Sequence, residues 1–292
     1  MRWTPGGRST NVEDRRGESG GRFPFPGGLR VGGGLGLGGI LLLALLSVVF
    51  KTDFLSLLST EDGTTGVSDS SGPAVPIDDP REEPMVDFVS FVLDDAQAIW
   101  SHLLAQAGTP YEETRLVLFR DGIESACGFA QSATGPFYCP GDRKVYIDLG
   151  FFGELRDRFG APGDFAQAYV LAHEIGHHVQ TLLGTEAAVR RAQGGRGESA
   201  NALSVATELQ ADCFAGIWAH WTANEKHLDE SDIDEGLRAA AAVGDDRLQR
   251  QAGRRVNPDA FTHGTSKDRA AWFRRGYDSG SIDACDTFAS AR

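Results

Sequence analysis

Two histidines and a glutamate have the types and spacing of a hydrolytic metal site. They are His173, Glu174 and His177, in the sequence YVLAHEIGHHVQ (169–180). Histidines four residues apart lie on one face of a helix, so both imidazoles can bind one Zn²⁺ at about 2.0–2.1 Å. Glu174 can then act as the general base on a water molecule that the metal activates. The alternative is a pair of histidines without a metal, but the surrounding apolar residues indicate a helix in the core, which favours the metal site.

A second helix supplies candidates for the remaining ligands. Glu208 and Asp212 are four residues apart in TELQADCFAG (207–216) and share a helix face. Glu208 is the predicted third zinc ligand. Asp212 would accept the free ring N–H of a zinc-bound histidine and so fix its orientation. An ordinary exposed pair of carboxylates is the alternative; the apolar residues around the pair favour a partnered site, because buried charges are paired or bind metals.

The sequence FTHGTSKDR (261–269) contains two further candidates, His263 and Arg269. His263 could stabilise the oxyanion of a tetrahedral intermediate, and Arg269 could pair with Asp212 or with another acid of the site. A loop histidine without a catalytic role is the alternative, because sequence alone does not bring this loop to the metal. We expect structural roles for the remaining histidines, His102, His178, His220 and His227.

Helices must position most of these residues. Apolar periodicity and capping signals predict an α+β fold, mainly helical with a small sheet. The expected helices are 85–106, 165–183 with Asp164 as N-cap, 202–223, 232–250 with Ser231 as cap, and 266–279 with Thr265 as cap. The expected strands are 115–120 and 145–152, and the sequence RRAQGGRGESA (190–200) is expected to be a loop.

The N-terminal part predicts a membrane anchor. Residues 1–30 contain six arginines, and residues 31–50 contain no charge and end in ILLLALLSVVF, long enough for one transmembrane helix. Arginine-rich flanks of a membrane helix stay in the cytoplasm. The helix would then be a single-pass anchor in the cytoplasmic membrane, with residues 51–292 on the outer side. A cleaved secretory signal and a glycine-rich arm are the alternatives. Residues 51–83 are expected to be an acidic Ser/Gly/Pro tether, and residues 84–292 the folded domain.

The net charge of the chain and its cysteines indicate which binding partners and which cellular compartment to expect. The formal net charge of −13 argues against a nucleic-acid-binding surface. Outside the cytoplasm, disulfides are expected, and four cysteines allow three connectivities. We favour Cys127–Cys139 and Cys213–Cys285; four free thiols are the alternative.

The sequence resembles the YpfJ-like neutral zinc metallopeptidases of bacteria over nearly the whole chain. The matching segments are MRW and NVEDRR near the N-terminus, CGFAQSATGPFYCPGDRKVYIDLGFF, GDFAQAYVLAHEIGHHVQ, ELQADCFAG, GDDRLQ and FTHGTSKDRAAWFRRGYDSG. The resemblance implies a membrane-anchored, zincin-like domain of the gluzincin type. It makes His173, His177 and Glu208 zinc ligands and Glu174 the base. The spacing of His263 and Arg269 is similar to that in membrane proteases with the same two helix motifs.

These observations predict a metallopeptidase with one Zn²⁺ that hydrolyses peptide bonds of a peptide or protein substrate outside the cytoplasmic membrane. An amide hydrolase acting on cell-wall material and a zinc-stabilised envelope scaffold without turnover are the alternatives. Glu174 argues against the scaffold, because a structural zinc site needs no base and favours four protein ligands. The sequence indicates neither the substrate nor the oligomeric state.

Overall fold

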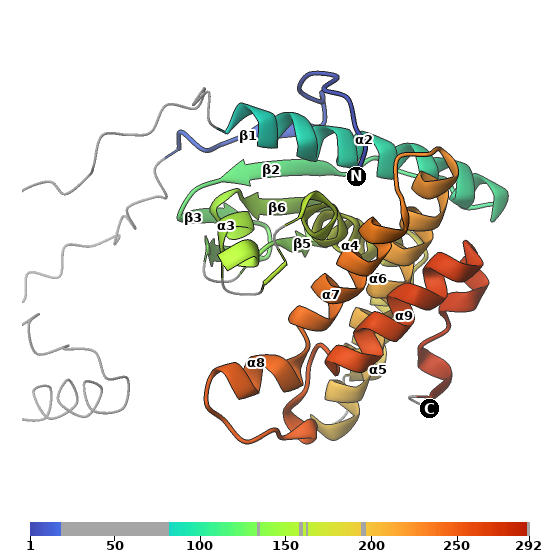
Figure 1. Ribbon diagram of the computed structural model, residues 1–292. Coiled ribbons are helices and arrows are strands. Elements are labelled where there is room, and N and C mark those ends of the chain that lie inside the picture. Colours follow the sequence, from blue (N-terminus) through green and yellow to red (C-terminus); the bar gives the residue numbers. More distant parts are fainter. Residues whose placement is uncertain (19–81, 133–134, 158–159, 162, 194–196, 291–292) are drawn as a thin grey trace, which may run out of the picture. The chain divides into compact units, whose positions relative to one another are not determined.

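Helices form most of the described part of the protein in the computed structural model (Figure 1). The structure describes residues 1–18, 82–132, 135–157, 160–161, 163–193 and 197–290. The helices are α2 (Glu83–Gln106), α3 (Gly150–Asp157), α4 (Asp164–Leu182), α5 (Thr185–Gln193), α6 (Gly197–Asn224), α7 (Glu230–Ala242), α8 (Asp245–Gln251) and α9 (Ser266–Ser279), with short 3-10 turns at Pro258–Ala260, Ile282–Cys285 and Phe288–Ser290. The mixed α+β, mainly helical fold with a small sheet agrees with the sequence analysis.

The main sheet has four strands in the order β1-β2-β6-β5. They are β1 (Val12–Asp14), β2 (Arg115–Phe119), β5 (Phe137–Cys139) and β6 (Lys144–Asp148). β1, β2 and β6 are parallel, whereas β5 is antiparallel to β6 and forms one edge. A separate hairpin joins β3 (Gly122–Ser125) to β4 (Gly128–Gln131). The predicted strand 145–152 is too long, because the chain turns at Leu149 and continues as α3.

The helices that carry the candidate site residues pack unusually closely. At Gly176 of α4, a Cβ atom would lie 3.0 Å from the carbonyl oxygen of Ala211 in α6. At Gly276 of α9, it would overlap the carbonyl of Cys213, and at Gly216 of α6 that of Phe273. Since glycine lacks a Cβ, the backbones of α4, α6 and α9 can approach one another. The core around them contains Trp100, Phe165, Tyr169, Phe214, Trp218 and Phe273, all fully buried.

Residues 1–18 are part of this folded unit. β1 pairs with β2 in parallel, Val12 opposite Leu116, and the α-amino group of Met1 forms an ion pair with Asp232 at 2.6 Å. The prediction of a separate tail over residues 1–30 therefore does not hold for residues 1–18. The short strand has a mixed polar sequence, VED, so its own pattern contains little of the apolar signal that identifies strands.

Two disulfides close the fold. Cys127 bonds to Cys139, and Cys213 bonds to Cys285, with Cα–Cα distances of 5.8 and 5.7 Å. Both predicted pairings are confirmed. The second bond connects α6, directly after Asp212, to the C-terminal turn Ile282–Cys285.

Four helix boundaries or caps differ from the predictions. Gly163, rather than Asp164, is the N-cap of α4, and no side chain caps this end. The predicted helix 232–250 is two helices, α7 and α8, separated at Gly244, where a side chain would meet the backbone of Ser266. Asp229, rather than Ser231, caps α7, because its carboxylate accepts from two backbone N–H groups. Much of the predicted loop 190–200 is helical, since α5 extends to Gln193 and α6 begins at Gly197.

The membrane segment predicted at residues 31–50 and the tether at 51–83, except for its last two residues, lie outside the described residues. Among the helices that the structure describes, none combines the length and the apolar character needed to span a bilayer.

Candidate metal and catalytic site

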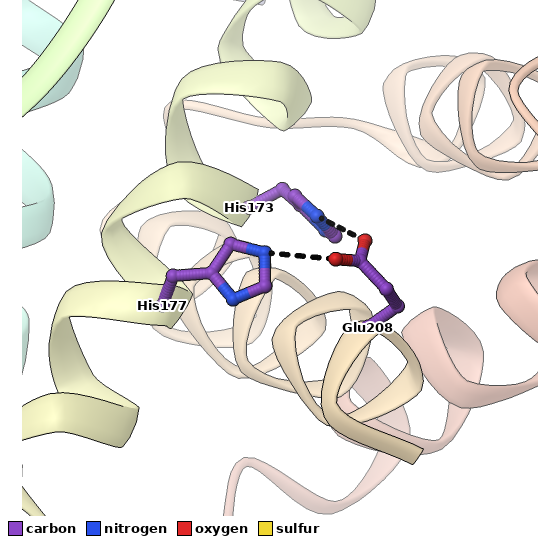
Figure 2. A group of neighbouring side chains, drawn as sticks. All are labelled: His173, His177 and Glu208. Carbon is purple, nitrogen blue, oxygen red and sulfur yellow. Dashed lines mark ion pairs between the residues drawn. The ribbon is translucent and has the colours of Figure 1, made fainter. Parts of the chain in front are cut away.

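The structure brings the three predicted ligands together at the crossing of α4 and α6 (Figure 2). Nε2 of His173 lies 3.2 Å from Oε2 of Glu208, and Nε2 of His177 lies 3.5 Å from Oε1 of the same carboxylate. One ligand atom from each residue lies within 4.8 Å of the other two. Two imidazole nitrogens and a carboxylate oxygen are a donor set suited to catalytic Zn²⁺, which has three protein ligands and one open position.

The opposite nitrogen of each imidazole is held by another side chain. Nδ1 of His173 lies 2.9 Å from Oδ1 of Asp212, and Nδ1 of His177 lies 2.8 Å from Oε1 of Gln180. Both partners are oxygen acceptors, so each Nδ1 carries a proton, and in the neutral imidazoles that bind a metal each Nε2 would present its lone pair. Outer partners of this kind set the tautomer and the ring orientation of metal-binding histidines. The side chains therefore fit a divalent metal.

Asp212 is the centre of a buried polar cluster behind the ligands. Its carboxylate is fully buried and accepts hydrogen bonds from Nε of Arg269 at 2.8 Å and from the hydroxyl of Tyr169 at 2.5 Å, in addition to His173. The predicted pairing of Arg269 with Asp212 is present. Oδ1 of Asp212 accepts from Tyr169, His173 and Arg269, whereas Oδ2 accepts from Arg269.

Electrostatics at the site favour a cation. Burial disfavours the charged imidazole, but Asp212 and Glu208 outweigh it and raise the pKa of His173 to about 10. Burial alone would raise the pKa of Glu208, yet the two histidines lower it well below its usual range. Without a metal, a proton on His173 and the guanidinium of Arg269 balance the carboxylates of Glu208 and Asp212; a divalent ion would take the place of that proton.

Glu174 lies beside the ligands on the wall of a cavity. The cavity has a volume of about 540 Å³ and is lined by His173, Glu174, His177, Glu208, His263 and Arg269, among others. Apolar side chains, including Phe137, Phe151, Val170 and Leu248, form much of the remaining wall. Burial raises the pKa of the Glu174 carboxyl, and the charges of His173 and His177, with a smaller effect from a backbone hydrogen bond of Tyr138 in β5, oppose this increase. A carboxylate with a raised pKa at a cavity wall has the properties of a general base.

His263 reaches the cavity from the loop before α9. Its Nδ1 lies 3.2 Å from Oδ1 of Asp245, and this hydrogen bond raises the pKa of the imidazole. The other oxygen of Asp245 accepts from the backbone N–H groups of Thr262, His263 and Gly264. The loop histidine is therefore fixed at the site by an acid at the start of α8.

The sequence analysis missed four residues that support the site: Tyr169, Gln180, Asp245 and, through its backbone, Tyr138. Gln180 follows His177 by three residues, which is a helical spacing and could have indicated contact. Tyr169 precedes His173 by four residues and offers the same signal. Asp245 is 18 residues from His263, and no local spacing relates the two. His178 has a structural role, as expected: its ring lies between the Tyr138 hydroxyl and the Glu112 carbonyl.

Comparison with known proteins agrees with this geometry. The chain is 44% identical to YpfJ of Escherichia coli K12, an uncharacterized protein, over 292 residues, which is the whole of both chains. It is also 44% identical to an uncharacterized protein of Mycobacterium tuberculosis over 209 residues, covering 68% of this chain and 69% of the relative. No solved structure gives a significant match. The family model described as "Putative neutral zinc metallopeptidase" matches residues 1–288, and the chain belongs to that family.

Proposed function

We propose that this protein is a zinc-dependent peptidase that hydrolyses peptide bonds in the cavity between α4, α6 and the loop before α9. The observation that carries the proposal is the position of Glu174, a buried carboxylate on the cavity wall beside the His173–His177–Glu208 cluster. Membership of a zinc metallopeptidase family supports zinc as the metal and a peptide or protein as the substrate.

The residues present support a division of roles. His173, His177 and Glu208 would hold the Zn²⁺, and Asp212 and Gln180 would orient the two imidazoles. Bound Zn²⁺ supplies a Lewis acid that polarises a carbonyl and lowers the pKa of water towards 7. Glu174 takes the proton of the attacking water and passes it to the leaving amine. His263, oriented by Asp245, donates a hydrogen bond to the carbonyl oxygen as negative charge develops on it.

We also propose that the domain acts outside the cytoplasmic membrane and is attached to it through residues 31–50. The disulfides Cys127–Cys139 and Cys213–Cys285 support an oxidising compartment, because such bonds are rare in cytosolic proteins. The uncharged and largely apolar sequence of residues 31–50 supports contact with the lipid.

The function is tested by comparing wild-type protein with Glu174→Gln. We expect the variant to retain one zinc per chain, measured by metal analysis, and to lose cleavage of a mixed peptide library by at least about 10²-fold. Glu230→Gln, an exposed position in the first turn of α7, is the matched control and should behave as wild type. Wild-type cleavage by Glu174→Gln would show that another group is the base.

The same experiment separates the alternatives. A peptidoglycan digest run in parallel would identify a cell-wall amide hydrolase if only that material were cleaved. If zinc bound with no metal-dependent cleavage of either material, the scaffold hypothesis would replace the peptidase.

A further inference from the structure

The N-terminal strand is connected to the catalytic domain over its whole length. In β1, Val12, Glu13 and Asp14 lie opposite Leu116, Val117 and Leu118 of β2. The backbone continues this pairing on both sides, since Leu116 N–H donates to Asn11 at 2.9 Å and Arg15 N–H donates to Leu118 at 2.8 Å. Residues 11–15 therefore form one edge of the main sheet, beside β2.

Buried charges hold the end of this segment. The side chain of Arg16 is fully buried and contacts Asp14 at 2.7 Å and Glu82 at 2.6 Å. Glu82 also pairs with Arg120, which directly follows β2, at 2.6 Å. Burial of a guanidinium in this way needs all its partners in place, because an unpaired buried charge is strongly unfavourable. Arg16 thus links the N-terminal segment to both the start of α2 and the sheet.

Contacts along the rest of the segment reach other faces of the domain. The rings of Trp3 and Phe88 are 5.2 Å apart, and the Ser9 hydroxyl donates to Asp94 at 2.6 Å. Glu13 accepts from Lys144 of β6 at 2.9 Å. These contacts involve α2 and β6 in addition to β2, so the attachment does not depend on a single interaction.

This arrangement excludes one membrane topology. A single crossing between residues 18 and 82 would place the two ends on opposite sides of a hydrocarbon layer of about 30 Å. Paired strands lie about 4.8 Å apart. We infer that residues 1–18 and the domain that begins at residue 82 lie on the same side of the membrane.

The arginines that predicted a cytoplasmic N-terminus have a different use in the structure. Arg8 pairs with Asp14 at 2.9 Å, Arg15 pairs with Glu18 at 2.7 Å, and Arg16 is buried. These charges bind acids of the folded unit. The inference does not depend on the peptidase activity, because it rests on the N-terminal contacts alone.

Cysteine labelling in the membrane-bound, full-length protein tests the topology. All four native cysteines are in disulfides, so a single introduced cysteine is the reporter. Thr10→Cys reports the N-terminal segment and Ser101→Cys, in α2, reports the domain; both positions are exposed. Each variant is treated with a membrane-impermeant maleimide in spheroplasts and in inverted vesicles, and labelling in detergent gives the maximum for each.

We expect Thr10→Cys and Ser101→Cys to be labelled to the same fraction in one orientation of the membrane and protected in the other. Labelling of the two cysteines from opposite sides would overturn the inference. If both were labelled only in inverted vesicles, the inference would stand and the proposal of a domain outside the cytoplasm would fail, which keeps the two distinguishable.

A cross-link tests the contact itself. The side chains of Asn11 and Glu113 meet at 3.0 Å on the surface, so cysteines at both positions should be joined by a short bis-maleimide. Mass spectrometry of the full-length chain in membranes should identify the 11–113 link within one molecule, which mixing isotope-labelled and unlabelled chains distinguishes from a link between molecules. Failure to form this link, with both thiols reactive singly, would also overturn the inference.

Discussion

At the scale of single residues, Asp212 is not a predicted metal ligand, yet it orients the ligand His173 and the arginine behind it. Its fully buried carboxylate contacts the imidazole of His173, the hydroxyl of Tyr169 and the guanidinium of Arg269. Burial would raise the pKa of Asp212, but Arg269 and His173 lower it and keep it charged. The same charge therefore orients a ligand and neutralises a buried arginine.

Replacing Asp212 separates these two roles. We expect Asp212→Asn to weaken zinc binding by about 10- to 100-fold and to lower the free energy of unfolding by about 3–5 kcal/mol, because Arg269 is left buried without a counter-charge. The double variant Asp212→Asn/Arg269→Met should recover much of the stability and none of the zinc affinity. Competition with a zinc chelator and urea denaturation measure the two quantities.

An exposed ion pair within α9, the helix that carries Arg269, provides the control. Arg274 and Asp278 are 2.8 Å apart and about half exposed, so Asp278→Asn should change stability by less than about 1 kcal/mol. Equal effects of Asp212→Asn and Asp278→Asn would contradict the role given to burial.

His263 depends in the same way on Asp245. His263→Ala should lower kcat by about 10²–10³-fold with zinc content unchanged, as for loss of one oxyanion donor. Asp245→Asn should lower the pKa of His263, because the hydrogen bond from Asp245 is the main cause that raises it. The protonated imidazole would then be lost at lower pH.

The pH profile of kcat checks this assignment. The alkaline limb should move to lower pH in Asp245→Asn and disappear in His263→Gln. If the alkaline limb stays at the same pH in both variants, the group that causes it is not His263.

At the scale of elements, the site depends on how closely α6 and α9 approach. Glu208 and Asp212 lie on α6, and Arg269 lies on α9, so the distance between these helices sets the Asp212–Arg269 contact. Gly216 and Gly276 permit the approach, because each meets the backbone of the opposite helix. Helical periodicity predicted both helices, but it did not show that they pack through glycines.

Alanine at either glycine should therefore separate the helices. We expect Gly276→Ala to lower the free energy of unfolding by about 1–3 kcal/mol or more and to weaken zinc binding, since Arg269 moves away from Asp212. Gly153→Ala in α3 is the control, because its Cβ would meet only the end of the Arg156 side chain, at 3.9 Å. Thermal unfolding and zinc titration measure the effects; wild-type zinc affinity in Gly276→Ala would show that the site tolerates a wider spacing.

The element predictions succeeded where a pattern is local. The helices around 85–106, 165–183 and 266–279 agree with α2, α4 and α9 within one or two residues at each end. The failures have tertiary causes. Gly244, between α7 and α8, lies against the backbone of Ser266, and β1 is a strand through its pairing with β2.

At the scale of the whole molecule, ion pairs connect residues 1–18 to the domain that begins at residue 82. Burial would raise the pKa of Asp14, but hydrogen bonds and charge from Arg16, with the charge of Arg8, lower it below its usual range. A carboxyl whose pKa is depressed by folding adds stability above its unfolded pKa of about 3.9, and this stability is lost as the pH falls through the folded value.

The attachment of residues 1–18 should therefore weaken in acid. At pH 7 we expect Asp14→Asn to lower the free energy of unfolding by about 1.5–3 kcal/mol, as for a hydrogen bond to a charged group. The difference from wild type should shrink as the pH falls below about 4, where Asp14 is protonated in the unfolded chain, and should vanish once the pH passes the lower pKa of the folded state. Urea denaturation of both proteins between pH 3 and 7 measures it, with the exposed Asp283→Asn as control; a difference that is constant with pH would exclude the ion pair as its source.

The sequence by itself determined the parts of this protein that rest on local spacing. His173, Glu174 and His177 on one helix, and Glu208 with Asp212 on another, follow from the period of the α-helix, and the two disulfide pairings and the helical class were also predicted. Only the tertiary structure decided that these two helices cross with their ligand atoms facing, that Asp245 holds His263 beside them, and that residues 1–18 join the sheet. These contacts link residues that are distant in sequence, and a local sequence period does not specify which distant segments pack together.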